Sequence, residues 1–155
     1  MWATRPLSAK PFWVTVGLVN IFVAVIGLIF AVAAIPAAIQ MPNSPEAPYR
    51  LEAYIVMTAI SSALAVLAGL SGRLLLRTEH RGLFLANLTF AAELTYARLV
   101  GFLWHSSPRF GPSIAASTGV GNMALLWWGI YPIAALLALN LGGWYVSTRP
   151  FRLDN

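Results

Sequence analysis

A carboxylate and a guanidinium interrupt the third long apolar stretch of this 155-residue chain, at Glu93 and Arg98. An ionised group is costly in hydrocarbon, so such a side chain inside a membrane segment faces the protein interior, a partner or the interface. Five positions separate the two residues, which turns them about 140° apart on a helix and excludes an intrahelical pair. We therefore expect Glu93 to face inward, either protonated or hydrogen-bonded by other helices.

Polar groups on the other apolar stretches reach a similar depth. At about 1.5 Å per residue, Glu93 lies about 15 Å from the inner end near Leu83, close to the midplane of a bilayer. This layer can be a proton relay, the polar anchor of a ligand pocket, or a protonated acid that holds helices together. No second acid or histidine shares this depth, which counts against a proton relay. The expected buried polar layer consists of Glu93, Asn20, Ser61, Ser62, Tyr96 and Tyr131.

Arg98 lies nearer the outer surface than Glu93. Its long side chain can reach toward lipid headgroups, or it can pair with Glu52, which stands where the second apolar stretch begins. Because Arg50, Glu52 and Tyr54 cluster at that point, we expect an outer-side ion pair between Glu52 and Arg98.

The remaining residues offer little other chemistry. The chain has no cysteine, and His80 and His105 fall at opposite membrane faces, where they cannot ligate one haem or metal ion. No carboxylate pair, nucleophile with a base, or phosphate-binding loop is present. We expect no metal site, no cofactor and no catalytic centre.

The composition identifies the solvent in which the chain folds. Hydrophobic residues make up 59% of the chain and charged residues 10%, whereas a soluble domain carries about 25% charged residues. The net charge of +5 arises from bases beside apolar runs, so it predicts membrane orientation rather than nucleic-acid binding. The chain is expected to be an integral membrane protein surrounded by membrane lipids.

Four apolar segments reach the roughly 20 residues that a transmembrane helix needs. They predict an all-α fold, in which one domain, residues 1–155, forms a polytopic four-transmembrane-helix bundle. Seven of the ten lysines and arginines lie in the N-terminal segment, the second connection and the C-terminal tail, so both termini are expected in the cytoplasm. The predicted spans are 12–38, 53–72, 83–104 and 119–146.

Two further patterns concern packing and lipid. Small residues recur at steps of three and four on the first two spans, which predicts close helix packing. Three arginines of the second connection are spaced by four and could hold anionic lipid at the inner surface, although orientation alone is the favoured interpretation. The packing seam consists of Gly17, Ala24, Gly27, Ala31, Ala65 and Gly69, and the arginines are Arg73, Arg77 and Arg81.

Two short motifs carry a resemblance to known sequences. They are Tyr49-Arg50-Leu51-Glu52-Ala53-Tyr54, and Ala97-Arg98-Leu99-Val100-Gly101 followed by Ser107-Pro108. The chain resembles small uncharacterised four-helix bacterial membrane proteins that are classed as a domain of unknown function. The resemblance implies a bacterial four-span bundle, located in the cytoplasmic (inner) membrane, and implies no activity.

Two classes of function remain. The absence of soluble domains and catalytic groups favours a non-catalytic integral membrane accessory subunit, packed against other integral membrane subunits of a larger complex of the lipid-transport or electron-transfer type. The alternative is a small enzyme or binding protein for a hydrophobic or lipid-like ligand, with a pocket inside the helix bundle.

Overall fold

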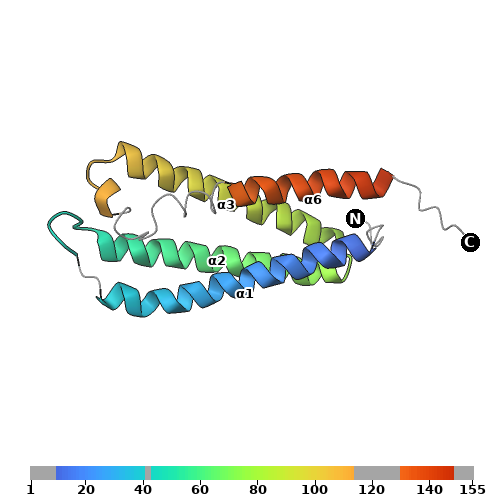
Figure 1. The fold of residues 1–155 in the computed structure, drawn as a ribbon, viewed down its shortest axis with the longest axis horizontal. Helices are drawn as coiled ribbons and strands as arrows, with labels where there is room; N and C mark the ends of the chain where they lie inside the picture. Colours follow the sequence, from blue (N-terminus) through green and yellow to red (C-terminus); the bar gives the residue numbers. More distant parts are fainter. Residues whose placement is uncertain (1–9, 41–42, 114–129, 149–155) are drawn as a thin grey trace, which may run out of the picture.

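The computed structural model describes residues 10–40, 43–113 and 130–148 and shows an all-helical chain (Figure 1). Helix α1 packs along α2, α3 returns along α2, and α6 packs against α3 and touches α1. Consecutive long helices run in opposite directions, so the start of α1, the end of α2 and the start of α3 lie at the same end of the bundle (Figure 1). The helices are α1 (Lys10–Gln40), α2 (Arg50–Leu76), α3 (His80–Ser106) and α6 (Tyr131–Thr148).

Three helices are long and apolar enough to cross a membrane, as predicted for an integral membrane protein. The helices α1, α2 and α3 extend two to four residues beyond the predicted spans at each end. The extensions carry charged residues such as Lys10 and Arg73, since a helix continues into the interface where apolar composition no longer detects it. Within the fourth predicted span, residues 119–129 lie outside the described part of the chain, and the apolar part of α6, Pro132–Tyr145, is shorter than a span.

The closest helix contact joins α1 and α2, and glycine makes it possible. A Cβ atom added at Gly72 would lie 2.6 Å from the carbonyl oxygen of Gly17, and one added at Gly17 would lie 2.8 Å from the carbonyl oxygen of Gly72. Helix backbones that approach this closely gain dispersion contacts that lipid cannot replace.

The small residues of the two predicted seams meet further along the same contact. A Cβ at Gly69 would lie 3.3 Å from the Cβ of Ala24, and a Cβ at Gly27 would lie 3.1 Å from the Cβ of Ala65. Ala24 and Ala65 are buried, whereas Ala31, the last residue of the α1 seam, is half-buried. The seam therefore sets the register between α1 and α2.

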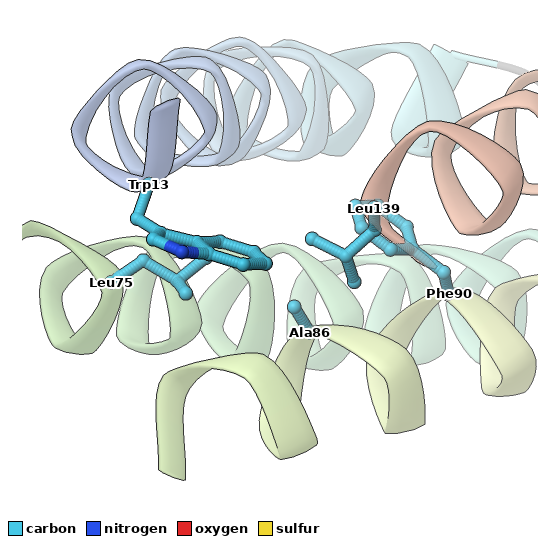
Figure 2. Packing of buried hydrophobic residues seen from close by; sticks show 5 residues of the cluster. All are labelled: Trp13, Leu75, Ala86, Phe90 and Leu139. Atoms are coloured by element: carbon cyan, nitrogen blue, oxygen red, sulfur yellow. The ribbon is translucent and has the colours of Figure 1, made fainter. Parts of the chain in front are cut away.

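One apolar cluster connects all four helices near the end that holds the α2–α3 turn. Figure 2 shows the Trp13 indole reaching from α1 across the top of Leu75 and Ala86 toward Leu139 of α6. A Cβ at Gly143 would lie 2.7 Å from the indole ring of Trp13, so a glycine of α6 leaves the space that the ring occupies. The cluster consists of Trp13, Leu75, Ala86, Phe90 and Leu139, all at most 4% exposed.

The α2–α3 turn closes with a left-handed residue. Thr78 has a φ of 56°, its amide donates to Leu75, and the amide of Glu79 donates to Leu74. This pair of bonds is the Schellman motif, which satisfies the last carbonyls of a helix and usually has glycine at the left-handed position. A β-branched residue at that position is strained.

Candidate functional site

Glu93 lies on the inward face of α3. The residues one turn before and after it on this face, Thr89, Phe90 and Ala97, are buried, whereas Glu93 itself is half-buried. Within the part of the chain that the structure describes, the Glu93 carboxyl forms no hydrogen bond or ion pair. The Glu93 carboxyl therefore lies on the packed face of α3 without a polar partner among the described residues.

The other residues of the expected polar layer occupy different positions in the structure. Tyr96, one turn further along α3, points its hydroxyl toward the side chain of Ser61 on α2. The neighbouring Ser62 hydroxyl donates to the Thr58 carbonyl at 2.7 Å and so is satisfied within α2. Tyr131 begins α6, and its side chain lies outside the described residues.

Asn20 belongs to a different level of the bundle. Its Nδ2 donates to the Ser71 hydroxyl at 3.0 Å, and that hydroxyl donates to the Ala68 carbonyl at 2.8 Å. Ser71 and Ser61 are ten residues apart on α2, which corresponds to about 15 Å. The expected single layer is therefore divided into an Asn20–Ser71 bridge and a separate contact of Tyr96 with Ser61, with Glu93 one turn before Tyr96 on α3. A depth counted along α1 alone places Asn20 level with Ser61. The close contact of Gly17 with Gly72 instead sets the register of α1 against α2 and places Asn20 beside Ser71.

The structure does not form the expected ion pair between Glu52 and Arg98. Both carboxylate oxygens of Glu52 accept hydrogen bonds from Asn43 Nδ2, at 3.4 and 3.1 Å. Arg98 is exposed on the opposite face of α3 from Glu93 and forms no ion pair with any described residue. The loop before α2 thus supplies the partner of Glu52, nine residues away in sequence, which the pattern of apolar spans could not reveal.

Sequence reasoning also missed a group of polar contacts at the end of the bundle opposite the α2–α3 turn. The amide of Tyr49 donates to the Ser113 hydroxyl at 3.0 Å, and Nε of Arg109 donates to the Tyr49 hydroxyl at 3.0 Å. The Arg109 guanidinium also lies over the Tyr49 ring, 5.0 Å from its centroid. These bonds tie the start of α2 to the segment that follows α3. Nothing in the local sequence pairs two loops sixty residues apart.

A second missed contact joins α3 to α6. Asn140 Nδ2 donates to Asn87 Oδ1 at 2.7 Å and to the Leu136 carbonyl at 2.8 Å. Asn87 in turn donates to the Leu83 carbonyl at 3.0 Å. The sequence did contain a signal for this contact: each asparagine stands within an apolar stretch, and an amide in hydrocarbon needs a hydrogen-bond partner.

The three arginines predicted at the inner surface gather around the α2–α3 turn. Arg73 and Arg77 lie one turn apart at the end of α2, Arg81 lies in the first turn of α3, and all three are exposed. Lys10, at the start of α1, lies at the same end of the bundle and is exposed (Figure 1).

No group of three metal-ligating side chains occurs among the described residues. A shallow, open hollow lies at the end of α3, lined by residues of the α3 terminus and the segment after it, including Trp104, His105 and Pro108. It contains no acid, and it lies more than two helical turns beyond Glu93. No family model, curated protein or solved structure matches the chain.

Proposed function

We propose that the protein is a non-catalytic accessory subunit of a larger membrane complex, held through α3. The single observation that carries this proposal is Arg98, an exposed arginine on a membrane-spanning helix without a partner among the described residues. It lies eight residues before the end of α3, which corresponds to about 12 Å. A guanidinium at this position costs several kcal/mol in lipid unless it reaches the interface or meets an acceptor.

The surface around Arg98 supports the same proposal. Leu99 and Phe102 lie beside it on α3 and are 54% and 66% exposed, so an apolar helix face surrounds the charge. A neighbouring subunit with a carboxylate at matching depth would cover both the apolar face and the guanidinium. The proposed arrangement has four spans in a bacterial inner membrane, with both termini on the cytoplasmic side. The exposed arginines Arg73, Arg77 and Arg81 at one end of the bundle support this orientation.

Purification from native membranes tests this proposal. The full chain carries a C-terminal tag, is extracted in mild detergent, and its co-purifying proteins are quantified by mass spectrometry. Stoichiometric membrane subunits that are lost in Arg98→Gln, while the variant itself remains folded, support the proposal. A chain that purifies alone, or partners that Arg98→Gln leaves unchanged, would contradict it.

A second candidate function rests on Glu93 and is a binding protein for a hydrophobic ligand. The half-buried carboxyl faces inward, lies one turn before Tyr96 on α3, and forms no hydrogen bond within the described residues. A polar anchor inside an apolar surrounding is typical of small-molecule sites. One enriched apolar molecule in the same purification, lost in Glu93→Gln but retained in Arg98→Gln, would favour this function over the first.

A further inference from the structure

The strongest charged surface lies at the end of the bundle that carries the α2–α3 turn. We call it the basic end and define it as Lys10, Arg73, Arg77 and Arg81, all of them exposed. The sequence places Arg73 and Arg77 one turn apart and Arg81 four residues further on, beyond the turn at Thr78. Three helices thus contribute positive charge to one surface.

The charges of the basic end are not neutralised within the described part of the chain. None of its four side chains forms a hydrogen bond or ion pair with a described residue. Glu79 is the acid nearest in sequence, and it makes no ion pair with these arginines and no side-chain cap to α3. The four groups therefore repel one another, and an anion that binds among them relieves this repulsion.

The start of α3 adds to the positive potential. Its first turn contains His80 and Arg81 and no acidic residue. A helix N-terminus carries a partial positive charge, so an arginine there is unfavourable until an anion lies beside it. The N-terminus of α3 and the arginine side chains therefore both attract an anion.

The position of the basic end relative to the lipid headgroups indicates which anion binds there. Trp144 and Tyr145, near the end of α6, are 66% and 49% exposed at the same end of the bundle. Tryptophan and tyrosine concentrate at the level of lipid headgroups. We propose that the basic end binds the phosphate headgroup of an anionic phospholipid, with the acyl chains along the apolar surfaces of the helices. This site is independent of the proposed partner contact at Arg98.

Native mass spectrometry of the purified full chain tests the site with defined lipids. The chain is titrated in neutral detergent with phosphatidylglycerol or with phosphatidylcholine. We expect tighter binding of phosphatidylglycerol, and at least about tenfold weaker binding in Arg77→Gln/Arg81→Gln, since each base near the surface contributes a factor of about five. The matched control, Arg98→Gln/Arg109→Gln, removes two arginines at the other end and should keep the affinity within about twofold.

Other outcomes would overturn the proposal. Equal losses in the two double variants would mean that net charge, not the basic end, attracts the lipid. Equal binding of the two lipids would exclude headgroup recognition, and full displacement by millimolar inorganic phosphate would indicate a site for a free anion. If Arg77→Gln/Arg81→Gln does not fold, Arg77→Lys/Arg81→Lys retains the charge and should retain the preference for phosphatidylglycerol; its loss would contradict the proposal.

Discussion

Gly72→Ala should destabilise the bundle because it separates α1 from α2. The added Cβ would lie 2.6 Å from the Gly17 carbonyl oxygen and 2.8 Å from Ile21 Cγ1, whereas ordinary contact begins at 3.4 Å. The helices must therefore move apart locally by about 0.8 Å, and a gap of this size removes about a quarter to a half of each dispersion contact along the seam. Overpacking of this kind costs about 1 to 3 kcal/mol.

Gly69→Ala is the matched control on the same helix face. Its Cβ would lie 3.3 Å from the Cβ of Ala24, close to ordinary contact, so we expect a change of about 0.5 kcal/mol or less. Both variants are compared with the wild type by SDS titration in mixed micelles, followed through tryptophan fluorescence. Because helices persist in SDS, the difference reports helix packing rather than helix propensity. Equal losses in the two variants, or a Gly72→Ala protein as stable as the wild type, would refute the close approach of Gly17 and Gly72.

Three further predictions use the same unfolding assay. Thr78→Gly should raise the free energy of unfolding by about 1 kcal/mol, because glycine adopts the left-handed conformation without strain; a loss of stability would show that the threonine side chain contributes more than its strain costs. A double-mutant cycle of Asn20→Ala and Ser71→Ala should give a coupling of about 0.6 to 1.7 kcal/mol, typical of hydrogen bonds between membrane helices, and additive effects would mean that the bond contributes nothing. The corresponding cycle of Asn87→Ala and Asn140→Ala should show a similar coupling, and its absence would contradict the amide pair that joins α3 to α6.

Hydropathy and residue spacing predicted the parts of the fold that depend on local composition. The three long apolar helices follow from uninterrupted apolar runs, and the seam on α1 and α2 follows from small residues at helical spacing. Gly72 also belongs to the seam, because it packs against Gly17. The ends of these three helices differed from the predicted spans, because polar residues are tolerated at the interface.

The candidate site was harder to predict because it depends on register between helices. The level of Asn20 on α1 relative to Ser61 on α2 is set by contacts of Gly17 and Gly72, which a depth count along one helix does not include. The partner of Glu52 came from Asn43 in a loop, where hydropathy has no pattern to follow. Local sequence thus indicated which side chains need partners but not which partners they find.

Photocrosslinking in native membranes tests the accessory-subunit proposal most directly. A benzophenone amino acid replaces Phe102, which is 66% exposed beside Arg98 on α3, or Phe22, which is 65% exposed on α1 and serves as the matched control. The proposal predicts a discrete adduct with another membrane protein from position 102 and none from position 22. Lipid adducts alone from position 102, or the same protein adduct from both positions, would contradict a partner surface on α3.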